Sequence, residues 1–127
     1  GKIAKPLKLT AMDREGLGVF DVILMANLID RLVDPSICLD SLAGLVRAGG
    51  YVILTSPYTW LEEYTPKEHW IGGKTQDKEV LSTEDALGDV LGDSFELLGR
   101  DNLPFLIREH ARKYQWSVAQ GTLWRRK

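Results

Sequence analysis

The sequence has one cysteine, no long apolar run and no large excess of either charge. Because Cys38 is the only cysteine, a disulfide within the chain is excluded, and a reducing, cytoplasmic location is expected. No uninterrupted apolar run approaches the roughly 20 residues that a membrane-spanning helix needs. The formal net charge of −2 gives no general reason to expect nucleic acid or an anionic membrane as a partner.

The composition is that of an ordinary folded domain. Hydrophobic residues make up 44% of the 127 residues and charged residues 27%, values that are typical of globular proteins. This length corresponds to one domain or part of one, so residues 1–127 are expected to form a single unit. The sequence does not begin with Met, which fits a fragment of a longer chain.

Two short apolar runs predict neighbouring parallel strands. Residues 20–26, FDVILMA, and residues 51–55, YVILT, are rich in β-forming residues and apolar at nearly every position. Such runs are typical of strands that are buried on both faces of a parallel sheet. The segment between them is long enough for a helical crossover, so a strand–helix–strand unit is predicted.

The helix between these strands has sequence signals at both ends. Asp34-Pro35 predicts its start, because Asp caps a helix N-terminus and Pro suits the first helical position. Apolar residues then recur at helical spacing: Leu39, Leu42, Ala43 and Val46. Arg47 is expected in the last turn, where a cation suits the helix dipole. Gly49-Gly50 predicts the end of the helix in a left-handed conformation.

The second half of the chain predicts a helix and two strands. Ser82 or Thr83 is expected to cap a helix with a short apolar face, and residues 95–98 to form a third strand. Residues 99–111 are expected to be a long connection. Residues 113–124 alternate between apolar and polar positions, which predicts an antiparallel strand at or near a sheet edge.

An aromatic segment follows the second predicted strand. LTSPYTWLEEYTPKEHW, residues 54–70, contains two Trp, two Tyr, three Glu, a His and two Pro. The prolines predict an ordered, turning loop rather than a helix. In open α/β sheets, ligands bind outside the carboxyl ends of parallel strands, so this segment and Asn27 are expected on one ligand-binding rim.

These motifs, in this order, resemble a known family. FDVILMANLIDRLVDPSICLDSLAGLVRAGGYVILTSPYTWLEE is similar to the second half of a class I S-adenosylmethionine-dependent methyltransferase. ANLIDRL, SPYTWLEEYTP and DNLPFLIREHARKYQWSVAQGTLWRR more closely resemble the 4-mercaptohistidine N1-methyltransferase domain of ovothiol-forming enzymes, over about residues 13–126. The resemblance implies S-adenosylmethionine as methyl donor and an amino-acid acceptor whose imidazole nitrogen is methylated.

The sequence departs from that family in its first half. The glycine-rich motif E/D-x-G-x-G-x-G, which holds the methionine part of the cofactor in the family, is absent. The family sheet has the order 3-2-1-4-5-7-6, and this chain is expected to supply strands 4, 5, 7 and 6 of a partial Rossmann-like α/β sheet. Strand 4, residues 20–26, would have an uncovered edge. We expect residues 3–11, a second copy in a homodimer, or a missing N-terminal half to cover it.

The resemblance also implies site residues. For the cofactor, Asp13 matches the acid that contacts the adenine amino group, and residues Ala26, Asn27 and Leu28 match the loop after strand 4. The candidate proton acceptors are a phenol, a carboxylate and an imidazole: Tyr58, Glu62 and His69. The candidate substrate contacts are two aromatic rings, a guanidinium and a second imidazole: Trp60, Tyr64, Arg108 and His110. Arg31 is an alternative partner for the substrate carboxylate.

Structural roles remain open for several of these residues. Asp13 and Asn27 also suit ordinary turns, and Trp60 and Trp70 also suit caps on the core. Two histidines far apart in sequence do not predict a metal site, and Cys38, between apolar helical positions, predicts a buried structural thiol. Two further functions remain open, namely a class I methyltransferase for another small molecule and a non-catalytic α/β module that binds a partner.

Overall fold

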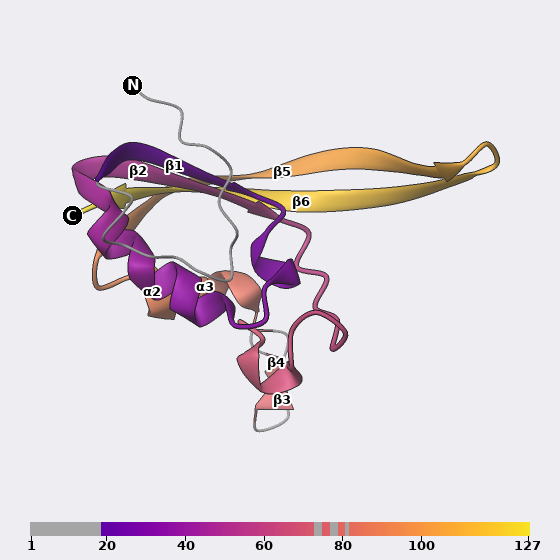
Figure 1. Ribbon diagram of the computed structural model, residues 1–127, viewed down its shortest axis with the longest axis horizontal. Helices are drawn as coiled ribbons and strands as arrows, with labels where there is room; N and C mark the ends of the chain where they lie inside the picture. The colour runs from indigo at the N-terminus through magenta and orange to yellow at the C-terminus, as the bar shows by residue number, and fades with distance from the viewer. Residues whose placement is uncertain (1–18, 73–74, 77–78, 81) are drawn as a thin grey trace.

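The computed structural model describes residues 19–127 except 73–74, 77–78 and 81, and shows a mixed sheet with two helices against it (Figure 1). The main sheet has the order β1-β2-β6-β5. β1 and β2 are parallel, whereas β6 is antiparallel to both of its neighbours. Its strands are β1 (Phe20–Ala26), β2 (Val46–Ser56), β5 (Phe95–His110) and β6 (Lys113–Arg126). This arrangement confirms the predicted partial Rossmann-like α/β sheet.

The remaining elements connect these strands. The two α-helices are α2 (Pro35–Leu45) and α3 (Thr83–Leu91), and two 3-10 turns are η1 (Ile29–Arg31) and η2 (Lys67–His69). A two-stranded antiparallel ribbon is formed by β3 (Thr75–Gln76) and β4 (Glu79–Val80). No helix in the described part of the chain is long and apolar enough to cross a membrane.

Helix α2 begins as predicted and ends earlier than predicted. Asp34 Oδ1 accepts a 3.1 Å hydrogen bond from the Ser36 backbone N–H, and Pro35 occupies the first turn. The helix ends at Leu45, and β2 starts at Val46 in an extended conformation. The prediction that Arg47 lies in the last helical turn is therefore wrong. Instead, its Nε donates to Asp21 Oδ1 at 2.6 Å and ties β2 to β1.

Gly49-Gly50 lies inside β2, so the predicted helix stop at this pair is also wrong. Gly49 has a φ of 79° and supplies the left-handed conformation that the sequence indicated, although not at a helix end. Pairing with β1 is irregular here, because Phe20 pairs with Val46 and Val22 with Tyr51. A Cβ on Gly50 would lie 2.6 Å from the Asp21 carbonyl oxygen, so only glycine allows this close approach of the two backbones.

The core lies between the helices and one face of the sheet. Among its most buried apolar side chains are residues of η1, α2, β2, α3 and β6: Ile29, Leu39, Leu42, Val52, Leu87 and Trp124. Cys38 is buried among them, as predicted for a structural thiol. The opposite face exposes Val22 and Leu24 of β1, 51% and 64% accessible, and Tyr51 and Ile53 of β2, 37% and 36% accessible. The predicted burial on both faces is therefore wrong for both strands. Helices cover only one face of the described sheet.

Helix α3 starts at the predicted cap. Ser82 Oγ accepts from the backbone N–H of Asp85 at 3.2 Å. The buried positions Ala86, Leu87 and Leu91 then face the core. The helix packs against α2 and leads into β5 through the turn at Gly92, so the two helices form one layer below the sheet (Figure 1).

The predicted long connection over residues 99–111 is wrong, because β5 continues without a break to His110. A register irregularity between Leu97 and Gly99 re-aligns the strand, after which it pairs with β6 almost to the turn. Pro104 is accommodated because β5 is an edge strand, where a missing N–H does not interrupt the ladder. The prediction that residues 113–124 form an antiparallel strand near the edge is confirmed by β6.

Within the described residues, β1 is the other edge of the sheet and pairs only with β2. The predicted pairing of residues 3–11 with this edge lies outside the described residues. Coverage by a second copy or by an N-terminal half stays a prediction.

Candidate functional site

The carboxyl ends of β1 and β2 are joined side by side at one rim of the sheet. The Asn27 backbone N–H donates to the Thr55 carbonyl oxygen at 2.7 Å, and the Thr55 hydroxyl donates to Asn27 Oδ1 at 3.2 Å. Asn27 has a φ of 51°, a left-handed conformation that Asn adopts more readily than most residues. Ala26 and Asn27 are exposed and Leu28 is half-buried. The three predicted cofactor residues therefore lie together on this rim.

We call residues 57–70, which follow β2 at the same rim, the rim loop. Its first turn is held by a buried carboxylate and a guanidinium from η1. Asp30, 1% exposed, accepts from the Thr59 backbone N–H at 3.1 Å through Oδ2. Arg31 Nη1 lies 3.5 Å from the same carboxylate oxygen and donates to the Thr59 carbonyl oxygen at 3.1 Å. The Arg31 guanidinium also lies 4.7 Å from the centroid of the Tyr64 ring.

Tyr58 connects the rim loop to the far strands of the sheet. Its Oη donates to Gln120 Oε1 at 2.7 Å, and Gln120 Nε2 donates to Glu84 Oε2 at 2.9 Å. Arg100 donates to the other Glu84 oxygen. The result is a continuous chain of polar groups from the rim, through β6, to α3 and β5.

In this series of hydrogen-bonded groups, burial and charge set the protonation states of Tyr58 and Glu84. Burial, with a smaller contribution from the negative charge of Glu84, raises the pKa of Tyr58 to about 12. Hydrogen bonds from Gln120 and Arg100 lower the pKa of Glu84. At neutral pH Tyr58 is therefore a neutral phenol that donates to Gln120, and its oxygen can still accept a hydrogen bond. Tyr58 has a φ of 54°, a strained conformation for a bulky residue, of the kind that gathers at functional sites.

The two tryptophans of the rim loop anchor it to the core. Trp60 is 9% exposed, and its indole N–H donates to Thr83 Oγ1 at 3.1 Å. Trp70 stacks on Trp60 with ring centroids 6.5 Å apart, and its indole N–H donates to the Thr65 carbonyl oxygen at 2.9 Å. These contacts support the structural role that the sequence left open. They leave little of the Trp60 ring for a ligand, and its role in substrate binding stays a prediction.

His69 is oriented by the chain just before α2. Its Nδ1 lies 3.0 Å from the Val33 carbonyl oxygen. Because a carbonyl only accepts, this contact requires a proton on Nδ1, which leaves Nε2 as an acceptor in the neutral ring. Thr65, fully buried, donates from Oγ1 to the Leu32 carbonyl oxygen nearby. The far end of the rim loop is thus fixed to residues 32–33.

The remaining predicted residues fall into two places. Glu62 and Tyr64 are exposed on the rim loop. Arg108 and His110 lie near the end of the β5–β6 hairpin, level with Tyr114 and Lys113 of β6. These partners lie six and seven residues from Gln120, or about 20–24 Å along the strand. Within one copy, therefore, Arg108 and His110 are not brought to the rim loop, and Asp13 lies outside the described residues.

Sequence reasoning missed four polar residues that shape the rim. They are Asp30, Thr55, Glu84 and Gln120. Asp30 had one usable signal, since an acid in an otherwise apolar stretch right after a parallel strand is a rim candidate. Gln120 and Glu84 carried no such signal, because their roles depend on contacts between distant segments.

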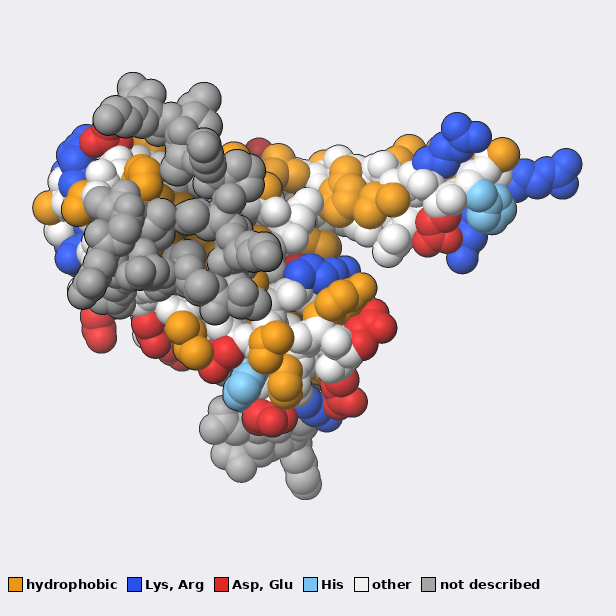
Figure 2. Space-filling model, in the orientation of Figure 1, with side chains coloured by type: hydrophobic (Ala, Val, Ile, Leu, Met, Phe, Trp, Pro, Cys, Tyr) orange, Lys and Arg blue, Asp and Glu red, His pale blue; other side chains and the backbone are white. Residues whose placement is uncertain are grey.

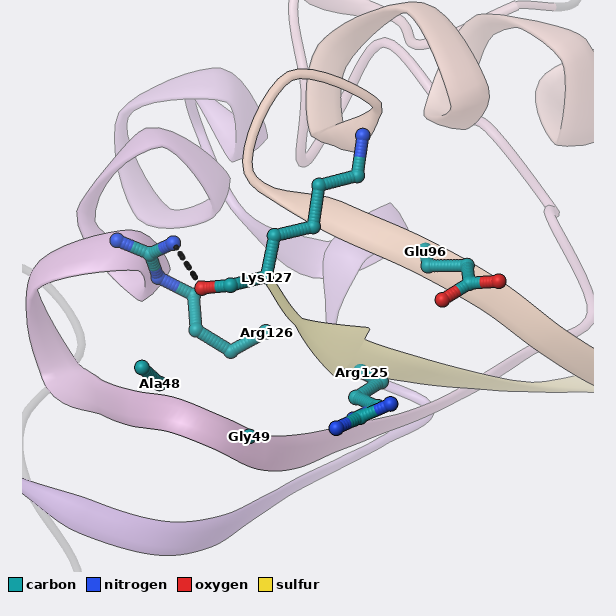
Figure 3. A pocket seen from close by; sticks show the side chains of 6 residues that line it. All are labelled: Ala48, Gly49, Glu96, Arg125, Arg126 and Lys127. Atoms are coloured by element: carbon teal, nitrogen blue, oxygen red, sulfur yellow. Dashed lines mark hydrogen bonds between the residues drawn. The ribbon is translucent and has the colours of Figure 1, made fainter.

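A pocket of about 430 Å³ lies at the opposite end of the sheet from this rim, and its lining is basic (Figure 3). Two of its three basic side chains, Arg126 and Lys127, are already bonded to backbone oxygens. Arg126 donates to the carbonyl oxygens of Ala43 and Lys127, and Lys127 Nζ donates to that of Gly92 at 2.7 Å. We therefore assign the pocket no part in the candidate site. Within the described residues, no three His, Cys, Asp or Glu side chains gather as metal ligands would.

Solved structures of other proteins share the fold of this chain. No family model matches the sequence, and no curated protein matches it. Several solved structures resemble it, including these two. One comes from work on the conversion of a disulfide bond into a thioacetal group during echinomycin biosynthesis, with a TM-score of 0.58 and 14% identity, covering 91% of this chain. The other is a SAM-dependent methyltransferase from Methanosarcina mazei, with a TM-score of 0.56, 16% identity and 90% coverage.

This chain spans 52% of the first of these proteins and 64% of the second. The identities are low, so the likeness concerns the fold and not the substrate. The chain therefore has the fold of part of a SAM-dependent methyltransferase.

Proposed function

We propose that this chain forms the acceptor-binding part of a class I methyltransferase that transfers a methyl group from S-adenosylmethionine to an imidazole nitrogen of a thiol-bearing histidine. The observation that carries the proposal is the rim itself, where Asn27, Arg31 and Tyr58 follow the carboxyl ends of two parallel strands. Ligands of open α/β sheets bind at such rims. The choice of acceptor rests on the motif resemblance in ANLIDRL and SPYTWLEEYTP.

The described residues offer contacts for one side of S-adenosylmethionine, the proposed methyl donor. Ala26 and Asn27 offer an exposed, turned backbone at the end of β1, the place where the resemblance puts the cofactor. The sequence contains no glycine-rich loop for the methionine part. When bound, S-adenosylmethionine supplies an electrophilic methyl group. We therefore assign to this chain the positioning of the acceptor and leave most of the donor contacts to residues outside it.

Positioning is the main demand of methyl transfer, because the attacking nitrogen must be aligned with the methyl group while water is excluded. The Tyr58 oxygen can accept a hydrogen bond from an imidazole N–H or an ammonium. Tyr64 offers an exposed ring face next to the Arg31 guanidinium. With its pKa near 12, Tyr58 is a poor base at neutral pH. Of the three candidates, Glu62 and His69 are then the better proton acceptors, and the His69 Nε2 has no hydrogen-bond partner among the described residues.

The test uses the natural gene product that contains this chain. It is incubated with S-adenosylmethionine and 4-mercaptohistidine, with histidine as the control acceptor, and the products are weighed by mass spectrometry. We expect one added methyl group on the imidazole of 4-mercaptohistidine, and a lower rate with the Tyr58→Phe variant. Turnover of an unrelated acceptor with none of 4-mercaptohistidine would reject this acceptor and leave a methyltransferase of other specificity.

A non-catalytic α/β module is the second candidate, and the missing glycine-rich motif favours it. Calorimetry of this chain with S-adenosylmethionine and S-adenosylhomocysteine separates the two. Micromolar binding, about −8 kcal/mol, would refute a module that has lost its cofactor. Absence of both cofactor binding by the chain and methyl transfer by the gene product would favour the module.

A further inference from the structure

The outer part of the β5–β6 hairpin projects beyond the rest of the sheet (Figure 1). β2 pairs with β6 only from Tyr51–Arg125 to Ser56–Gln120. Residues 103–119, which we call the arm, therefore pair only with each other within the described part of the chain. A two-stranded hairpin is marginally stable by itself in water. This arm is thus expected to gain stability from a surface that covers it.

Both faces of the arm expose apolar side chains, with Leu103 and Ile107 on one face and a larger set on the other, where Arg108 lies opposite Tyr114. Cross-strand partners share a face, so Leu106 lies beside Trp116, and Pro104 beside Val118. Tyr114 follows on the same face by alternation. Leu106 is 61% exposed, Trp116 64%, Tyr114 56% and Val118 44%. Together they expose on the order of 450 Å², well within the range of about 300–600 Å² of the largest apolar patch on a typical monomer. We call this the arm face.

The end of the arm is basic, whereas the rim loop is acidic. The charged side chains at the end of the arm are Arg108, Glu109, Arg112 and Lys113. Glu109 is paired with Lys113 at 3.0 Å, which leaves two arginines without a carboxylate partner among the described residues. On the rim loop, Glu62 and Glu63 are exposed. Figure 2 shows Lys and Arg side chains at the far end of the arm and Asp and Glu side chains on the body, across an open angle between the two.

We propose that the arm face is the interface of a homodimer, in which two arms pack face to face and run in opposite directions. The basic end of each arm then reaches the acidic rim loop of the other copy. A single two-fold arrangement therefore covers the arm face of both copies and brings their opposite charges together. A standard interface buries about 800 Å² per partner. The arm face supplies roughly half of this, and Leu61 and Tyr64 of the rim loop, 38% and 44% exposed, add to it.

This arrangement does not rest on the proposed function, yet it has a consequence for the rim. Arg108 and His110 lie about 20–24 Å from Gln120 in their own copy. In the two-fold pair with antiparallel arms, they come from the second copy to the neighbourhood of the rim loop. The guanidinium and imidazole that a single copy keeps apart from the rim are then supplied by its partner.

The first test is the mass of the chain in solution by sedimentation or light scattering. We expect a dimer, with twice the 14.3 kDa mass of one chain, at a protein concentration of about 100 μM. The Leu106→Ser/Trp116→Ser variant is expected to raise the dimer dissociation constant at least about 100-fold. Val33→Ser/Ile37→Ser is the matched control, because these side chains are 64% and 67% exposed near α2. It is expected to leave the dimer intact.

Two further variants test the direction of the arms. Arg112→Glu is expected to weaken the dimer, and addition of Glu63→Lys is expected to restore it by reversing both charges. The Arg112→Cys/Glu63→Cys variant is expected to form a disulfide between copies. Within one copy the two positions are too far apart for a bond that needs Cβ atoms about 4 Å from each other.

Three results would overturn the proposal. The first is a monomer at every concentration. The second is a dimer that survives Leu106→Ser/Trp116→Ser with its circular dichroism spectrum unchanged. The third is a dimer that Val22→Ser/Leu24→Ser dissociates while the arm variant does not, because this would assign the interface to the open edge at β1.

Discussion

The phenol of Tyr58 donates a 2.7 Å hydrogen bond to the side-chain amide of Gln120, 62 residues away in the sequence. This bond ties the start of the rim loop to β6, and through Glu84 to α3. It also holds Tyr58 in a left-handed conformation that a bulky residue rarely adopts. The shape of the rim therefore depends on the far half of the sheet as well as on the strand that precedes it.

Because the pKa of Tyr58 is raised in the folded state, the free energy of unfolding is expected to change with pH in the alkaline range. The pKa rises from 10.0 to about 12 in the folded state, so this group's contribution is fully present below pH 10 and is lost as pH rises through 12. We expect a loss of about 1–2 kcal/mol across this window after allowance for solvent screening. Urea unfolding at several pH values measures it, and Tyr58→Phe is expected to remove this part of the dependence.

Tyr51→Phe is the matched control for that experiment, because Tyr51 is 37% exposed and does not belong to the rim. The Tyr51→Phe variant is expected to retain the loss of stability that Tyr58 causes between pH 10 and 12. If Tyr58→Phe also leaves the slope between pH 10 and 12 unchanged, the buried hydrogen-bonded state of Tyr58 is wrong.

The Trp60–Thr83 hydrogen bond predicts measurable coupling between the rim loop and α3. Trp60→Phe removes the indole N–H while keeping an aromatic ring, and Thr83→Val removes the acceptor while keeping a similar shape. Each change is expected to cost about 1–2 kcal/mol, with a coupling energy of about 0.5–1.5 kcal/mol in a double-mutant cycle. Additive effects in urea unfolding would mean that the two residues do not interact.

Asp30 is predicted to hold the rim loop in place. Asp30→Ala removes the acceptor of the Thr59 backbone N–H and the ion-pair partner of Arg31, and is expected to cost about 2–4 kcal/mol. Asp89→Ala, at an exposed position of α3, is expected to change stability by less than about 0.5 kcal/mol. Equal effects of the two changes, measured by thermal unfolding, would contradict a special role for Asp30.

Substitution by alanine is expected to have opposite effects on stability at two glycines, Gly72 and Gly88. Gly72 has a φ of 77°, and a Cβ there would lie 2.5 Å from the backbone of Thr83, so Gly72→Ala is expected to cost about 2 kcal/mol or more. Gly88 lies inside α3 with no atom within 4 Å of an added Cβ, so Gly88→Ala is expected to stabilise by about 0.5–1 kcal/mol. Thermal unfolding of both variants checks the pair, and the same sign for both would contradict it.

Local signals in the sequence predicted much of the fold. Asp34-Pro35 marks a helix start by chemistry that acts within a few residues, and the structure has the cap there. The apolar run at residues 20–26 predicted β1 for the same reason. The end of α2 at Leu45 was missed because pairing of Val46 with Phe20 draws the chain into β2 before the glycines are reached.

Long-range contacts explain what the sequence did not reveal. Residues 99–111 contain Gly99 and Pro104, which locally favour a loop, but the partner strand β6 extends them as β5. For the rim, periodicity and strand order placed Asn27 and residues 54–70 together. The pairing of Tyr58 with Gln120 joins segments that no local pattern relates. The sequence groups the predicted substrate residues Arg108 and His110 with the rim because Gly99 and Pro104 locally indicate a loop, whereas the β5–β6 hairpin carries both residues away from the rim.

The most direct test of the proposed acceptor role is a titration of this chain with 4-mercaptohistidine, followed through the indole N–H signals of its tryptophans by nuclear magnetic resonance. We predict saturable shifts of the Trp60 and Trp70 signals with a dissociation constant of about 1 mM or tighter, and weaker shifts with histidine. Tyr58→Phe is expected to weaken binding. No shift at saturating concentrations, or equal shifts with an unrelated amino acid, would contradict the account.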